Sequence, residues 1–186
     1  SSPVQAGANS PTRTGGLNIA PGNSASVQND SVYDLVIASS SQVDPASALL
    51  FIGNAGKVVL TGPDATSLPS FNIAGTEGAA LDNGYQMTAS QVNLNGSSSL
   101  SLLNNSVLTL GAGGISQGKT INLSNSTLYT TDTTSIKTSV SLDGSSTIQT
   151  IGASNTTSME GGVTGTGNLL KTEDGKLIIS TTSKPS

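Results

Sequence analysis

The chain has 186 residues, of which only 10% are charged, with seven Lys and Arg against eleven Asp and Glu and a formal net charge of −4. It contains no Cys, His or Trp, which excludes a zinc finger, an iron–sulfur or haem site, a cysteine protease and a Ser-His-Asp triad. Net acidity with few, scattered basic residues argues against binding to the nucleic-acid backbone or to an anionic membrane surface, and no apolar run approaches the roughly 20 residues of a membrane helix.

The composition favours an all-β fold. β-Branched residues, above all Thr, are abundant, Glu, Lys and Arg are scarce, and no stretch shows a capped helical stripe. Low charge together with many β-branched residues argues against disorder. No linker divides the chain, so we expect one domain over residues 1–186.

The first half of the chain fits the repeat less cleanly than the second, although its apolar runs are spaced close to one rung apart. Residues 1–16 have no periodic pattern, and we expect an irregular cap or a frayed end there. Clusters of Gly, Pro, Asn and Asp then separate short apolar runs at 32–37, 49–52, 57–60 and 71–73. Pro63, Pro69 and several glycines predict a longer loop or irregular coil over residues 64–83.

Three similar blocks organise the second half, where residues 91–180 are expected to form the most regular coils: 100–110 (LSLLNNSVLTL), 120–130 (TINLSNSTLYT) and 139–150 (SVSLDGSSTIQT). The first two align without a gap at an offset of 20, which places Leu103 opposite Leu123 and Leu108 opposite Leu128. The third follows after 19 residues with one extra residue in its turn. Asn-Gly and Asp-Gly turns are also hairpin signals, but a direct repeat favours a parallel solenoid over an antiparallel meander, because equivalent positions of stacked coils have equivalent neighbours.

Within each block, alternation of apolar and polar residues divides the inside of the solenoid from the outside. It places Ile121 and Leu123 inside, and we assign five polar side chains to the solvent face: Thr120, Asn122, Thr130, Ser141 and Thr150. Their simplest role is to keep a one-sided strand soluble without charge, and the alternative is hydrogen bonding to a neighbouring molecule or a glycan. At roughly 20 residues per rung the chain would form about eight or nine coils, a rod about 40 Å long.

The segment 161–180 (GGVTGTGNLLKTEDGKLIIS) resembles the passenger-associated repeat of bacterial autotransporters, Gly-x-Gly-x-Leu-x-Lys-x-Gly-x-Gly-x-Leu-x-Leu-Ser. With a slip of one residue before the lysine, the matching positions are Gly165, Gly167, Leu169 or Leu170, Lys171, Gly175, Leu177, Ile179 and Ser180. The segment departs from the family pattern at Glu173 and Asp174, where small residues are usual, and the Asn-x-Tyr-x-Gly portion does not follow it.

This resemblance implies a right-handed parallel β-helix and a passenger fragment at the bacterial cell surface or secreted, exported through a C-terminal β-barrel that this sequence does not include. It implies a role in adhesion, in self-association and biofilm formation, or in host-cell contact. Its partner would be a host-cell surface protein or glycan, or another copy of the chain. The sequence leaves open a second function, that of a released effector acting as the ligand of one host receptor. The absence of Cys agrees with export, because periplasmic disulfides hinder threading of a chain across the outer membrane.

Chemical motifs point to no active site. The G-x-S-x-G match at residues 114–118 has no histidine to serve as base, and the Gly-rich stretches at 111–114 and 161–162 predict turns. The Gly-Gly-x-Gly-x-Asp of calcium-binding repeats lacks its Asp here. Acidic residues occur singly, apart from Glu173 and Asp174 in a predicted solvent-facing turn, which leaves a carbohydrate-processing enzyme as the least favoured function. We therefore expect no enzyme and no catalytic, cofactor-binding or metal-ligating residue.

Overall fold

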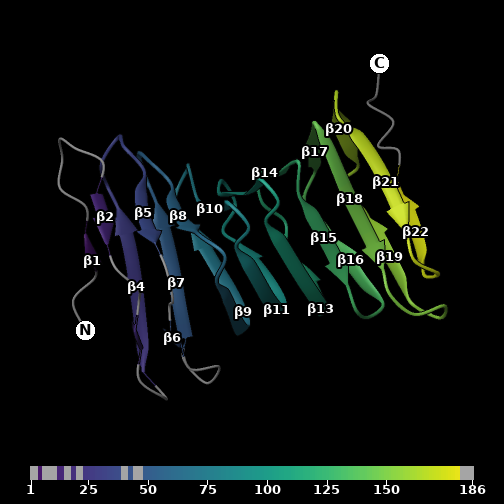
Figure 1. The fold of residues 1–186 in the computed structure, drawn as a ribbon, viewed down its shortest axis with the longest axis horizontal. Coiled ribbons are helices and arrows are strands. Elements are labelled where there is room, and N and C mark those ends of the chain that lie inside the picture. The colour runs from purple at the N-terminus through teal and green to yellow at the C-terminus, as the bar shows by residue number, and fades with distance from the viewer. Residues whose placement is uncertain are drawn as a thin grey trace.

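A computed structural model describes residues 4–5, 12–14, 18–19, 23–38, 42–43 and 48–180. These residues form a parallel β-solenoid of about seven turns with about 21 residues in each turn (Figure 1). Every strand pairing among them is parallel, which confirms the prediction from the repeats and excludes the antiparallel meander. No helix occurs in this part of the chain, and hence none that could cross a membrane.

Two large sheets and one small sheet run along the solenoid axis. The eight-stranded sheet consists of β2 (Thr12–Thr14), β5 (Leu35–Ala38), β8 (Val58–Thr61), β10 (Ala79–Asp82), β12 (Ser99–Leu103), β14 (Thr120–Ser124), β17 (Val140–Asp143) and β20 (Val163–Gly165). The small sheet pairs β3 (Asn18–Ile19) with β6 (Gln42–Val43).

The twelve-stranded sheet covers the remaining sides of the coil. It contains β1 (Val4–Gln5), β4 (Ser24–Asn29), β7 (Ala48–Gly53), β9 (Ala65–Ala74), β11 (Gln86–Leu94), β13 (Val107–Ile115), β15 (Thr127–Thr130), β16 (Thr134–Ile136), β18 (Ser145–Thr150), β19 (Thr156–Met159), β21 (Asn168–Thr172) and β22 (Lys176–Ile179). The first half of β13 pairs with β15 and its end with β16. A long strand such as β13 therefore covers two sides of its coil, and in the next coil two separate strands, β15 and β16, cover the same two sides. With one strand of the eight-stranded sheet, each full coil has three sides.

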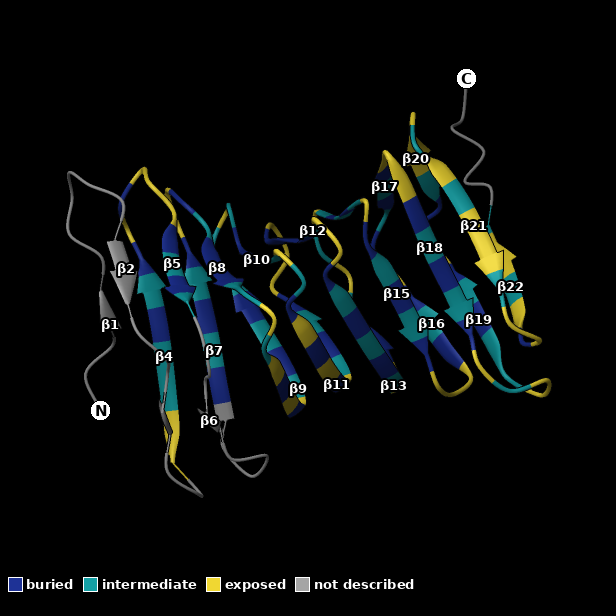
Figure 2. Cartoon of the chain, in the orientation of Figure 1, coloured by how far each residue is buried: buried dark blue, intermediate teal, exposed yellow. Residues whose placement is uncertain are grey.

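The core consists of apolar rows that run from coil to coil. One row of the eight-stranded sheet contains Ile37, Leu60, Leu81, Leu102, Leu123 and Leu142, which are in register on successive strands and at most 5% exposed. Neighbouring strands are about 4.8 Å apart, so each side chain inside this row is covered by the one before and the one after it. Figure 2 shows the resulting alternation of buried and more exposed residues along the strands.

The gapless repeat alignment is correct after the turn and one residue out of register along the whole of β12 and β14. Leu108 pairs with Leu128 as predicted, and the extra residue of the third block does fall in its turn. Leu103, however, pairs with Ser124, and it is Leu102 that pairs with Leu123. The reason is that the turn after β12 is one residue longer than the turn after β14.

The prediction of a loop or irregular coil over residues 64–83 is wrong, because β9 and β10 occupy most of it. Pro69 lies within β9 where the strand bends, between two buried stretches whose alternation is out of phase, and a bend tolerates the missing N–H of proline. Pro63 precedes β9, in a bend. The proline and glycine signals mark the corners of a regular coil.

Glycine is required at one of these corners by close stacking. Gly78 has a φ of 71°, and a Cβ added there would lie 2.0 Å from the backbone oxygen of Ser99 in the next coil. Gly96, in contrast, has no atom within 4 Å of its added Cβ. The two glycines therefore differ in how far a side chain would disturb the coil stacking.

Three threonines form a polar cluster inside the solenoid. Thr130, Thr150 and Thr157 are fully buried; the hydroxyls of Thr130 and Thr157 are 2.5 Å apart, and Thr150 donates to Thr157 at 2.9 Å. The assignment of Thr130 and Thr150 to the solvent face is wrong, because each lies two residues after an inward side chain, Leu128 or Ile148. The other three residues of that set, Thr120, Asn122 and Ser141, are half-buried in positions that alternate with the core residues.

Two further expectations concern the extent of the coil. The estimate of eight or nine coils referred to the whole chain, and the described residues form about seven. The irregular segment expected over residues 1–16 lies largely outside the described residues, although β1 and β2, which fall within it, extend the two large sheets through pairing with β4 and β5.

Candidate binding groove

The motifs considered for chemistry have structural roles. Ser116, the serine of the G-x-S-x-G match, follows β13, where its hydroxyl donates to the carbonyl of Leu94 at 3.1 Å and accepts from the amide of Leu94 at 2.8 Å. Glu173 and Asp174 are exposed in a bend, as predicted. Within the described ranges, no three His, Cys, Asp or Glu residues lie close enough together to hold a metal ion.

The outer surface of the eight-stranded sheet contains a groove of about 380 Å³ that spans β5, β8, β10 and β12. Pockets that hold small ligands have volumes of roughly 300–1,000 Å³, so this one is at the lower end. Its lining residues are Asp34, Val36, Lys57, Val59, Thr61, Ala80, Asp82, Ser101 and Leu103. Parallel pairing places seven of them in two rows, Val36–Val59–Ala80–Ser101 across the middle of the strands and Thr61–Asp82–Leu103 at their carboxyl ends. The other two, Asp34 and Lys57, immediately precede β5 and β8.

The floor of the groove consists of short side chains. Val59, Ala80 and Ser101 alternate with core residues and therefore point outward, yet they are only 7%, 1% and 4% exposed. Side chains on an outer face are normally well exposed. Ala and Ser end close to the sheet, so longer neighbours rise above them and enclose the floor.

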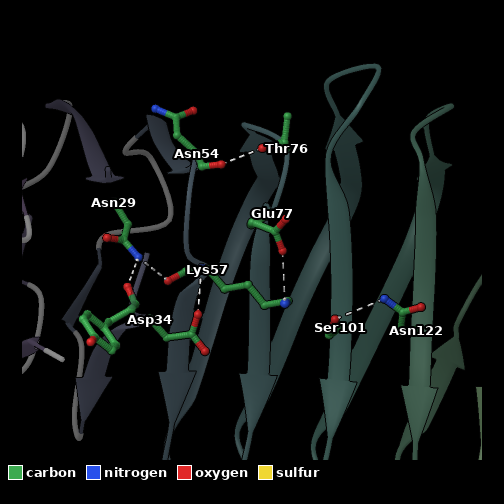
Figure 3. A network of polar contacts seen from close by, with 9 residues as sticks. Asn29, Asp34, Asn54, Lys57, Thr76, Glu77, Ser101 and Asn122 are labelled. Carbon is green, nitrogen blue, oxygen red and sulfur yellow. Dashed lines mark hydrogen bonds and ion pairs between the residues drawn. The ribbon is translucent and has the colours of Figure 1, made fainter. Parts of the chain in front are cut away.

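One end of the groove is polar and is held by hydrogen bonds (Figure 3). Asp34 accepts a hydrogen bond from the backbone amide of Lys57 at 2.9 Å, and Asn29 donates to the carbonyl of Lys57 at 2.9 Å. The ammonium group of Lys57 lies 3.5 Å from Glu77. Both partners of this pair are partly exposed, so it contributes at most about 1 kcal/mol, but it offsets the one cation of the groove.

At the other end, Asp82 lies at the end of β10. Its Oδ1 accepts from the amide of Asn83 and from the side chain of Asn104, each at 2.8 Å. Both donors are neutral, so they orient the carboxylate without cancelling its charge. Asn122 lies in β14, the strand next to β12, beside the floor of the groove, and its side chain donates to the hydroxyl of Ser101 at 3.3 Å. The groove therefore has an apolar floor and carboxylates at two ends.

A second polar corner lies next to the groove. Asp30 follows β4, and its carboxylate accepts from the side chains of Gln28, at 2.8 and 3.0 Å, and of Asn54, at 2.7 Å. These hydrogen bonds, Gln28 first, favour the charged form and hold the pKa of Asp30 below its ordinary value. The carboxylate thus ties the turn before β5 to the next coil.

Sequence reasoning did not find the groove. The groove depends on outward positions of successive coils taken together, whereas the alternation pattern assigns each polar position to the outer face separately. The signal is a run of short side chains along one outward row, Val59, Ala80 and Ser101, at a spacing of one turn. Comparisons of the chain with models of protein families, with curated proteins and with solved structures found no match.

Proposed function

We propose that the chain is a non-catalytic bacterial β-solenoid, exposed at the cell surface or secreted, that mediates adhesion, self-association or host-cell contact. The observation that carries the proposal is the groove, whose floor and rims are set by strands paired on both sides. A surface ordered in this way loses little conformational entropy on binding, which favours affinity from many modest contacts.

Other outward side chains are also held in fixed positions. On the outer face of β9 and β11, Asn93 donates to the hydroxyl of Ser70 at 2.8 Å and to the amide oxygen of Asn72 at 2.9 Å. Asn72 donates in turn to the carbonyl of Leu49 at 3.2 Å. Such ordered rows of neutral polar groups suit contact with a protein or glycan surface, and they support a role in binding.

The resemblance to autotransporter passengers is supported by the position of its glycines. Gly165 has a φ of 100°, and an added Cβ would lie 2.2 Å from the oxygen of Leu142. At Gly175 the Cβ would lie 2.5 Å from the oxygen of Thr150. Of the two leucines that could match the motif, Leu169 packs against the core whereas Leu170 is 56% exposed. Two of the motif glycines thus let one coil stack closely on the coil before it.

The test is an adhesion assay with beads that carry the purified chain. We expect the beads to adhere to cultured epithelial cells or to cluster with one another, and we expect beads carrying an unrelated acidic protein to do neither. Beads that remain dispersed and unattached would contradict the proposal. Saturable binding of the free chain to a single receptor, without adhesion, would instead support the released ligand. Polysaccharide turnover abolished by replacing one acidic residue would support an enzyme.

A further inference from the structure

We propose that the groove binds an extended basic peptide segment of a partner protein, with the alkyl stems of its Lys or Arg side chains on the apolar floor and their cationic ends at Asp34 and Asp82. This inference rests on the proposed binding function and names the ligand class for one surface. It follows from three features of the groove: its charge, its floor and the separation of its two carboxylates.

The charge of the groove is unbalanced toward the negative. Lys57 is its one cation, and that charge is offset by Glu77 in the only ion pair found among the residues that the structure describes. Asp34 and Asp82 receive hydrogen bonds from neutral groups alone. A cationic ligand would therefore meet two carboxylates whose charge no described residue neutralises, and charge complementarity of this kind gives specificity and fast association.

The floor fits an alkyl stem better than a sugar ring. Val36, Val59 and Ala80 form an apolar strip between the two carboxylates, and no aromatic side chain lines the groove. Lys and Arg place their methylene groups on such a surface and keep the charged end in water. Their side chains thus match a floor that is apolar in the middle and acidic at its ends.

The separation of the carboxylates selects an extended ligand. Asp34 immediately precedes β5, and Asp82 ends β10, two strands away. A strand spacing of about 4.8 Å and a rise of about 3.3 Å per residue place their Cα atoms about 16 Å apart along a diagonal of the groove. Basic residues four positions apart in an extended peptide are separated by about 13 Å, and their flexible side chains cover the remainder.

The test uses fluorescence anisotropy with a labelled serine peptide that carries two lysines four positions apart. We expect Asp34→Asn and Asp82→Asn each to weaken binding about three- to fivefold, and the double variant about tenfold or more. Ala80→Leu fills the floor from outside the core without changing the charge, and we expect it to weaken binding at least about tenfold. Circular dichroism establishes that each variant is folded.

Two controls separate this site from general attraction of a basic peptide to an acidic protein. Asp132→Asn removes one charge at an exposed corner between β15 and β16 and should leave the affinity unchanged. A peptide with norleucine in place of lysine keeps the alkyl stems without the charge and should not bind. Equal loss in Asp132→Asn, or equal binding of the norleucine peptide, would overturn the assignment.

The bead assay distinguishes failure of this inference from failure of the proposed function. Adhesion that persists in the Asp34→Asn, Asp82→Asn double variant, with no lysine-peptide binding by the parent chain, would overturn the basic-peptide site and leave adhesion standing. Groove-dependent peptide binding without any adhesion would support the site and contradict the adhesive role.

Discussion

Introducing the same carboxylate at two adjacent residues tests the inside–outside assignment of the solenoid. Leu123 is fully buried between Leu102 and Leu142, whereas Asn122, its neighbour in β14, is half-buried on the outer face. We expect Leu123→Asp to unfold the coils around it and Asn122→Asp to leave them folded. The two variants place the same charge on opposite faces of one strand.

The structure sets the size of the difference. Removing a buried leucine side chain costs about 2–5 kcal/mol, and a carboxylate without a partner in the apolar row adds several kcal/mol more. That total is comparable to the whole stability of a typical domain, about 5–15 kcal/mol. Asn122→Asp loses one hydrogen bond, from Asn122 to Ser101, worth about 0.5–1.5 kcal/mol.

Urea denaturation followed by far-UV circular dichroism measures both variants. Because repeat proteins can unfold in parts, the midpoint and the breadth of the transition should both be recorded. We expect little or no cooperative transition for Leu123→Asp and a nearly unchanged one for Asn122→Asp. Equal tolerance of both substitutions, or greater damage from Asn122→Asp, would show that the register of β14 is incorrect.

Three further predictions concern the corners and the polar core. Gly78→Ala should lower the urea midpoint by more than Gly96→Ala, because only the first places a Cβ against backbone; equal midpoints would refute the close stacking. Thr157→Val should cost about 1–3 kcal/mol in thermal denaturation, because it leaves the buried hydroxyl of Thr150 without its acceptor; a neutral result would show that this hydroxyl has another partner. The folded state holds the pKa of Asp30 below its ordinary value. The charged carboxylate therefore stabilises the fold at pH values above the unfolded-state pKa, and this stabilisation is lost as the pH falls through the lower pKa of the folded state. Chemical-shift titration should show a pKa for Asp30 below that of a model peptide, and Asp30→Asn should reduce the loss of stability in that acidic range.

The parallel fold could be predicted because the repeats encode register directly. Within β13 and β15, which follow the turns, the sequence offset equals the strand register, as between Leu108 and Leu128. The alignment fails at Leu103 because one coil has a longer turn, and a gapless comparison cannot see a residue added between two strands. The register of a solenoid can therefore be predicted most reliably within a strand and least reliably across a corner.

The burial of Thr130 and Thr150 shows a second limit of pattern reasoning. Both residues alternate correctly with the core, although hydroxyl side chains are more often exposed than buried. The stack of coils offsets the cost of burying them, because Thr157 from the facing strand supplies a hydrogen-bond partner for both. Strand alternation predicts the side to which a threonine points, but its partner, 27 residues along the chain from Thr130, depends on the three-sided shape of the coil.

The groove was hard to predict from the sequence, because it depends on register between coils and on side-chain size on the outer face. In the same outward row, the coils beyond Ser101 carry Asn122 and Ser141, both of which are more exposed than Ala80 and Ser101. The hollow is therefore confined to the coils where a short side chain lies beside longer ones such as Lys57, Asp82 and Leu103. A solenoid built from near-identical turns can acquire a distinct binding surface through a few outward residues, without any change to its inward rows. Substitutions at those outward positions should alter binding while leaving stability almost unchanged, which is the opposite of what we expect for Leu123.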